Sequence, residues 1–130
     1  EWIVHPNGAL GLIAIHAVAD NPRELAKALK TAWSAASEEI FDGCVLVKTG
    51  SVELLIWAPV AYQIEYKALE VMAPDQLPLV VGATIAIERA RPLQALLRAN
   101  NVPFAIAEGD RVLVACEQAA GLMIEFVPQV

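Results

Sequence analysis

Residues 111–127 read RVLVACEQAAGLMIEFV, two apolar runs joined by a turn of small residues. This pattern predicts a β-hairpin near the end of the chain. A single carboxylate, Glu125, lies within the second apolar run. An acid in such a strand is costly unless a partner or a wet cavity stabilises it, so Glu125 is a candidate functional residue.

An earlier stretch repeats this pattern. Residues 45–57 read VLVKTGSVELLIW and place Glu53 in the position that matches Glu125, 72 residues later. The triplet Ile-Ala-Ile also occurs twice, at 13–15 and 85–87, with the same spacing of 72 residues. We therefore interpret the chain as one supersecondary unit that is used twice.

Composition limits the classes of function. A chain of 130 residues fits one domain with its own core. Hydrophobic residues make up 57% of it, yet no apolar run approaches the roughly 20 residues of a membrane helix. The apolar surplus predicts a cavity with apolar walls, a surface covered by another subunit, or both. The net charge of −6 and the absence of a basic cluster argue against nucleic acid or an anionic membrane as partner.

The two cysteines favour a reducing compartment. Cys44 and Cys116 each lie next to an apolar strand, and they form neither a CxxC motif nor a Cys/His cluster. We expect both to be buried free thiols, as is common in the cytoplasm, and no signal peptide is visible. The expected location is therefore cytoplasmic.

The first unit is predicted at about 9–58, after an entry arm or linker at 1–8 that ends in a Pro-Asn-Gly turn. A buried strand is expected at 9–19, followed by a helix with Asn21 as N-cap and Pro22 in its first position. A short edge strand is possible at 37–43, and strands at 44–50 and 51–58 form a hairpin. Alternation puts Glu53, Leu55 and Trp57 on one face, as a candidate pocket wall.

The second unit is predicted at about 79–128, after a connector at 59–78 that carries three prolines. Its first strand covers 79–89, and a helix opened by Pro92 ends near Asn100 and Asn101. Strands follow at 103–108, 111–116 and 122–127. Each unit is thus a strand, a helix and two or three antiparallel strands, and residues 9–130 form a single domain in this interpretation.

From about residue 9 to residue 128 the chain resembles the vicinal oxygen chelate superfamily, the glyoxalase, dioxygenase and bleomycin-resistance-like proteins. The segment 120–126, AGLMIEF, is similar to the family ending in which the glutamate is a metal ligand, and Glu53 matches the equivalent ligand of the first unit. The resemblance implies an α+β fold: two βαβββ units pair into one curved, mostly antiparallel sheet, a cup with helices on its outer face. The arm HPNG, residues 5–8, resembles the start of the second half of longer glyoxalase-like proteins, so this domain is expected to be the C-terminal half of such a protein.

The sequence departs from the family at the other metal ligands. Active members place a His or Gln near the start of each first strand, and the candidate positions here are Leu12 or Ile13 in the first unit and Gly82 or Thr84 in the second. None of them is an imidazole, so no metal site is expected.

One alternative for a metal stays open. His16 and Glu88 are also 72 residues apart, one step beyond the Ile-Ala-Ile triplets. If both point into the cup with Glu53 and Glu125, a His/Glu₃ cluster for a divalent metal results. In the competing interpretation, His16 is a hydrogen-bonded buried histidine and Glu88 is a solvated strand end.

Three functions follow. The first is binding of a small-molecule ligand in an apolar cup without the usual metal, with Glu125 and Glu53 anchoring or polarising the ligand while other residues line the site: Trp57, Leu55, Met123, Glu88 and His16. The second is a divalent-metal-dependent lyase, isomerase or dioxygenase. The third is a non-catalytic half that covers a partner module of the same protein or forms a homodimer.

Overall fold

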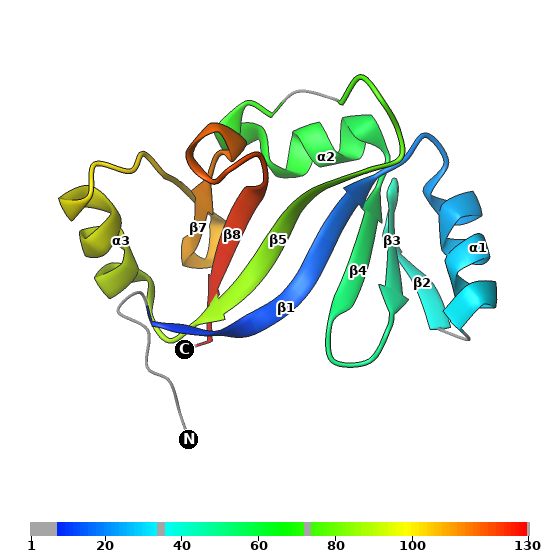
Figure 1. Ribbon diagram of the computed structural model, residues 1–130, viewed down its shortest axis with the longest axis horizontal. Coiled ribbons are helices and arrows are strands. Elements are labelled where there is room, and N and C mark those ends of the chain that lie inside the picture. Colours follow the sequence, from blue (N-terminus) through cyan, green and yellow to red (C-terminus); the bar gives the residue numbers. More distant parts are fainter. Residues whose placement is uncertain (1–7, 34–35, 72–73, 130) are drawn as a thin grey trace.

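The computed structural model describes residues 8–33, 36–71 and 74–129 of the chain. Residues 1–7 of the expected entry arm, which include His5, therefore lie outside the described residues. Eight strands form one curved, unclosed sheet in the order β2-β3-β4-β1-β5-β8-β7-β6 (Figure 1). This arrangement confirms the expected α+β fold with a cupped sheet.

The two halves contain the same elements in the same order. The first half consists of β1 (Ala9–Val18), α1 (Pro22–Trp33), β2 (Ala36–Phe41), β3 (Cys44–Lys48) and β4 (Glu53–Trp57). The connector contains the helix α2 (Pro59–Glu65) and the 3₁₀ turn η1 (Lys67–Leu69). The second half consists of β5 (Leu79–Ile87), α3 (Ala90–Ala99), β6 (Ala105–Ala107), η2 (Glu108–Asp110), β7 (Arg111–Val114), η3 (Cys116–Gln118) and β8 (Met123–Pro128).

The first strands of the two halves meet at the centre of the sheet. β1 and β5 pair antiparallel, while β1 pairs parallel with β4 and β5 pairs parallel with β8. The remaining neighbours are antiparallel. Each half thus has its fourth strand next to its first, so Glu53 and Glu125 both lie beside a central strand.

The helices of the two halves cover the outer face of the sheet. α1 packs on a cluster that contains Val47 and Ile56, and α3 packs on a cluster that contains Val112 and Phe126. Both helices begin where local chemistry predicts. The backbone amide of Glu24 donates to Oδ1 of Asn21 at 3.2 Å, which confirms the N-cap of α1. α3 begins at Ala90, with Arg89 as N-cap, so Pro92 lies within the first turn instead of opening the helix.

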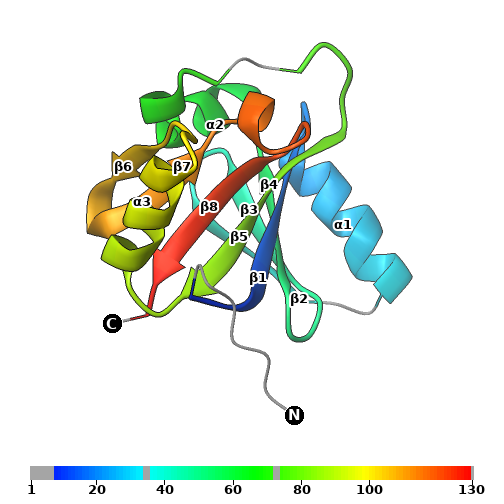
Figure 2. The ribbon, with the colours of Figure 1, turned by 60° about the vertical axis from the view of Figure 1, so that its left-hand side comes forward.

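The connector helix α2 covers the inner face, in addition to the helices of the two units on the outer face (Figure 1). Trp57 faces the opposite side of β4 from Ile56, and it packs with Tyr62, Tyr66 and Met123 in a cluster of its own. Figure 1 places α2 over the concave side, away from α1 and α3, and Figure 2 also separates α2 from α1. The cup is therefore largely filled by protein side chains.

The register of the strands corrects the expected equivalence of the two halves. Ala14 pairs with Glu53, whereas Thr84 pairs with Glu125. The two glutamates are 72 residues apart, but Ala14 and Thr84 are 70 apart. The structural counterpart of His16 is therefore Ala86, which is buried like His16, and not Glu88, which follows the end of β5 and is exposed. The Ile-Ala-Ile triplets are two residues out of structural register.

Part of the apolar surplus lies at the surface. Leu10, Leu12 and Ile13 are exposed although β1 is a central strand of the sheet. Cys44 is buried as expected, but Cys116 is exposed, and both thiols are free. In the described part of the chain, no helix is long and apolar enough to cross a membrane.

Candidate functional site

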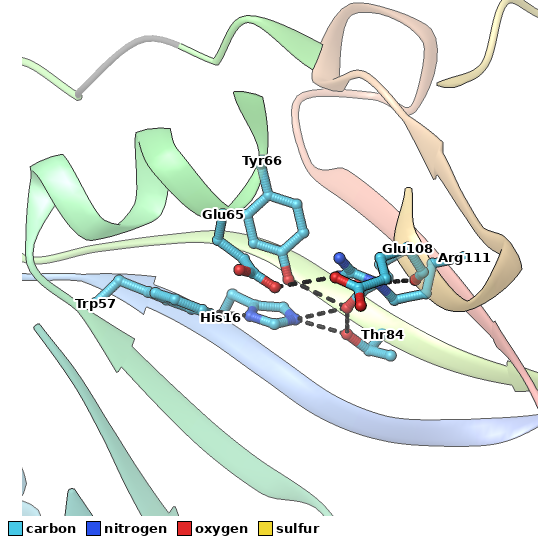
Figure 3. Close-up of polar contacts among 8 residues, drawn as sticks. His16, Trp57, Glu65, Tyr66, Thr84, Glu108 and Arg111 are labelled. Atoms are coloured by element: carbon cyan, nitrogen blue, oxygen red, sulfur yellow. Dashed lines mark hydrogen bonds and ion pairs between the residues drawn. The ribbon is translucent and has the colours of Figure 1, made fainter. Parts of the chain in front are cut away.

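A group of polar side chains is enclosed between the inner face of the sheet and the end of α2. We call it the buried polar centre; Figure 3 shows all of its members but Glu125 with labels. It consists of His16, Trp57, Tyr66, Thr84, Arg111 and Glu125. Five strands and the connector contribute to it, so it joins the two halves of the chain.

Strand alternation explains why these side chains meet. On β8, Phe126 packs with α3 on the outer face, which directs Met123 and Glu125 to the inner face. Thr84 is the neighbour of Glu125 in the β5–β8 ladder. On β7, Leu113 pairs with Glu125, and Arg111, two residues earlier, shares its face.

Glu125 is a buried carboxylate, 5% exposed, whose oxygens accept hydrogen bonds from three side chains. Oε1 accepts from the Thr84 hydroxyl at 2.6 Å and from the Tyr66 hydroxyl at 3.1 Å. Oε2 accepts from the Arg111 guanidinium in a charge-assisted bond. Burial and the neighbouring charge of Glu125 raise the pKa of Tyr66, so its hydroxyl stays a donor. The cost of an acid in an apolar strand is thus met by protein donors.

The direction of the hydrogen bonds fixes the protonation of His16. The Trp57 indole can only donate, and its Nε1 lies 3.0 Å from Nδ1 of His16, so Nδ1 carries the lone pair. The Thr84 hydroxyl spends its one hydrogen on Glu125, so the contact of 2.6 Å between Thr84 and Nε2 of His16 requires a proton on Nε2. Burial lowers the pKa of His16 to about 4, against an opposing effect of Glu125. The ring is therefore neutral, and its distance of 3.6 Å to Glu125 is not an ion pair.

Arg111 supplies the positive charge of the centre. Burial disfavours its guanidinium, but the bond to Glu125 and the charges of Glu125 and Glu65 outweigh that cost and raise its pKa. Nη1 also lies 3.4 Å from Oε1 of Glu65, at the end of α2, and Nε donates to the backbone carbonyl of Glu108 at 3.0 Å. Arg111 thereby links the sheet to the connector helix.

The residues present do not fit the metal of the resembling family. Beside Glu53, strand β1 carries Ala14, whose side chain has no ligand atom. Beside Glu125, strand β5 carries Thr84, whose hydroxyl already donates a hydrogen bond to Glu125. The described residues include no group of three or more His, Cys, Asp or Glu that could hold a metal ion. The His/Glu₃ cluster considered above does not form, because Glu53 and Glu88 are exposed whereas His16 and Glu125 are buried.

The predicted site residues are distributed over three environments. Glu53 and Glu88 are exposed, so neither lines an enclosed site. Leu55, Trp57 and His16 lie in or against the packed inner core, with His16 1% exposed. Glu125 is in the buried polar centre, and Met123 reaches a hollow described below.

Sequence reasoning missed most partners of Glu125. The sequence presents Thr84 only as a metal-ligand position, and it places Tyr66 in the connector, where a packed crossover is favoured over a cover for the mouth of a pocket. Arg111 had a usable signal, because strand pairing between 111–116 and 122–127 brings its charge to the face that carries Glu125. No signal in the sequence predicts the positions of Tyr66 and Glu65, because no local pattern indicates which face of the sheet a connector covers.

A hollow of about 440 Å³ opens next to the inner core, between the connector and the turn before β8. Its volume lies within the range of roughly 300–1,000 Å³ that is typical of small-molecule sites. Its apolar wall includes Tyr62, Leu69, Val80, Val81 and Met123. The charged residues in its described lining are the acids Glu70, Asp75 and Glu117.

Comparisons with known proteins identify the fold. No protein-family model and no curated protein matches the sequence. Among solved structures, the chain is similar to methylmalonyl-CoA epimerase from Mycobacterium tuberculosis, with 14% identity over 98% of this chain and 93% of that chain and a TM-score of 0.73. A methylmalonyl-CoA epimerase variant from Streptomyces coelicolor in complex with 2-nitronate-propionyl-CoA has 8% identity over 94% of this chain and 99% of that chain, with a TM-score of 0.65.

A hypothetical protein from Bacillus halodurans is similar as well, with 10% identity, coverage of 92% and 94%, and a TM-score of 0.63. The epimerases belong to the vicinal oxygen chelate superfamily. At these identities the similarity establishes the fold, and the resemblance seen in the sequence is confirmed at that level. One fold hosts many chemistries, so activity has to be argued from the site.

Proposed function

We propose that the protein binds a small, largely apolar molecule in the 440 Å³ hollow at the edge of the cup, without a metal ion. The observation that supports this most strongly is the shared wall: Tyr62 and Met123 belong both to the packed inner core and to the lining of the hollow. A preformed apolar surface of this kind binds a ligand at a low cost in conformational entropy.

The charge of the hollow narrows the class of ligand. Glu70, Asp75 and Glu117 line it, and the whole chain carries a net charge of −6. A site lined by one sign of charge concentrates ligands of the opposite sign and disfavours those of the same sign. The proposed ligand is therefore a neutral molecule or an amine with an apolar body, and not a CoA thioester, whose phosphates are anionic.

The buried polar centre has a supporting role in this proposal. All the hydrogen bonds of Glu125 described above are made to the protein, and Tyr66 and Arg111 use them to hold the end of α2 against the sheet. α2 in turn carries Tyr62, one wall of the hollow. Glu125 is thus a positioning residue that acts on the ligand site through the connector.

A binding screen with a blocked variant tests the proposal. Val80 lines the hollow and Ile106 lies on β6 outside it, and both are 50% exposed, so we expect either position to accept a tryptophan without loss of the fold. We expect hydrophobic amines and neutral aromatic compounds to raise Tm of the wild type and of Ile106→Trp, and to bind Val80→Trp at least about tenfold more weakly. Propionyl-CoA is expected to give no shift.

Two results would contradict the proposal. Calorimetry could show unchanged affinity in Val80→Trp, which would place the ligand elsewhere. Propionyl-CoA could bind the wild type more tightly than the amines, which would show that the acidic lining does not select the ligand.

A further inference from the structure

Glu125 corresponds to a metal ligand in the family that the chain resembles, but here its carboxylate binds the guanidinium of Arg111. Oε2 of Glu125 accepts a bond from the Arg111 guanidinium, and the same nitrogen of Arg111 lies 3.4 Å from Glu65. We propose that Arg111 takes the place of a metal ion, and that Arg111 and Trp57 together close the buried polar centre to divalent metals. This inference concerns a different part of the molecule from the ligand hollow and holds whether or not the hollow binds a ligand.

The first barrier is the Arg111 guanidinium, which carries a positive charge and occupies the place beside Glu125 that a metal ion would need. A divalent ion at Glu125 would have to displace the guanidinium, because both would use Oε2 of the same carboxylate. Oε1 is engaged by Thr84 and Tyr66, so it offers no alternative. With Arg111 in place, the incoming ion would also meet a positive charge in a partly buried site, where repulsion is only weakly screened.

The second barrier is the tautomer of His16. A histidine binds a metal through a nitrogen that carries a lone pair, and the hydrogen bond at the other nitrogen decides which one that is. Trp57 donates to Nδ1 at 3.0 Å and so leaves the proton on Nε2, the nitrogen that faces Glu125. The only imidazole near Glu125 within the described residues is therefore a donor toward the place that a metal would occupy.

The two barriers together predict which changes would open the centre. Arg111→Ala removes the cation and exposes Oε2 of Glu125. Trp57→Phe removes the indole donor and allows the proton to move to Nδ1. The lone pair of Nε2, 3.6 Å from the carboxylate, can then bind a metal ion, which would replace the N–H of His16 as the partner of the Thr84 oxygen. Since each change removes one barrier, the double variant is expected to gain metal affinity that neither single variant reaches.

Zn²⁺ titration followed by calorimetry, with circular dichroism as a check of folding, tests this inference on the whole chain. We expect no saturable site in the wild type or in Arg111→Lys, which keeps the positive charge. We expect one Zn²⁺ per chain in Arg111→Ala/Trp57→Phe, at least about tenfold tighter than in either single variant. Adding Glu125→Gln to the double variant should abolish this binding.

Several outcomes would overturn the inference. One is a folded double variant that binds no Zn²⁺, and another is Zn²⁺ binding that survives Glu125→Gln. A third outcome concerns the wild type: stoichiometric Zn²⁺ binding by the wild type that is lost in a Glu125→Gln variant with an unchanged circular dichroism spectrum would show that Arg111 does not close the centre.

Discussion

Glu125 and His16 show how two polar residues can be buried among apolar strands. Each is at most 5% exposed, and each finds a complete set of partners in side chains contributed by other strands. The donors run in one direction, from the Trp57 indole through His16 and Thr84 to Glu125. This series of hydrogen bonds ends at the Glu125 carboxylate, which also accepts a hydrogen bond from the Arg111 guanidinium. Neither His16 nor Glu125 therefore needs an exogenous ligand to be stable in the interior.

The low pKa of His16 predicts how stability depends on pH. The folded protein holds this ring neutral down to a pKa of about 4, whereas the unfolded chain takes up a proton near pH 6.5. Below pH 6.5 the unfolded state therefore binds more protons, and the free energy of unfolding should fall as the pH is lowered. The contribution is fully present above pH 6.5 and is lost toward pH 4, by up to about 3 kcal/mol.

Urea unfolding at pH 7.0 and pH 4.5 measures this effect, with His16→Gln as the reference because glutamine does not titrate. Both proteins respond to the protonation of carboxylates, so the difference between them isolates His16. The wild type is expected to lose more stability than the variant over this interval. Equal losses would show that His16 is not held neutral by the fold.

At the scale of elements, the central strands show how closely the two halves pack. Gly82 on β5 lies against β8, and an added Cβ would come within 2.6 Å of the backbone oxygen of Met123. A backbone atom cannot move aside as a flexible side chain can. The glycine is therefore required by the close approach of β5 to β8.

Gly82→Ala is expected to lower the free energy of unfolding by about 1–3 kcal/mol, the usual cost of overpacking. Gly11→Ala on β1 is the matched control, since a Cβ there would meet nothing within 4 Å. The control should change stability by less than about 0.5 kcal/mol. Thermal or urea unfolding of both variants compares them, and equal stabilities would refute the close approach of β5 to β8.

Much of the element pattern could be predicted from the sequence because local physics determines it. The cap at Asn21 and the alternation that separates Leu55 and Trp57 from Ile56 are examples. The predicted start of α3 at Pro92 differs from the observed start at Ala90, because a proline is tolerated throughout the first turn of a helix. The inner position of α2 could not be predicted, because it depends on Tyr62 and Tyr66 fitting a surface made by distant strands.

The same limit explains the errors about the site. The sequence singles out Glu125 as an acid in an apolar run. The structure explains its burial, because Thr84, Tyr66 and Arg111 donate hydrogen bonds to its carboxylate. Glu53 has the same local sequence but is exposed, because α2 packs over Glu125. The repeat in the sequence predicted the pairing of two units, but the two-residue offset between β1 and β5 decided which side chains meet.

At the scale of the whole molecule, the two halves have the same topology and different roles. Glu53 remains at the surface of the first half, while Glu125 anchors a network that crosses from β4 through β1 and β5 to β8. The network and α2 fill the cup, and the remaining hollow lies at its edge. The central claim is that protein donors alone satisfy the hydrogen bonds of this network, and we propose that no metal ion takes part in it.

The position of the proton on His16 tests this claim most directly, because the ring lies at the junction of the two halves. Nitrogen-15 NMR of the imidazole in the wild-type protein at pH 7 measures it. We predict a neutral ring with the proton on Nε2 and the lone pair on Nδ1, unchanged by added Zn²⁺. A proton on Nδ1, a cationic ring, or a change of the Nε2 signal on addition of Zn²⁺ would contradict the account.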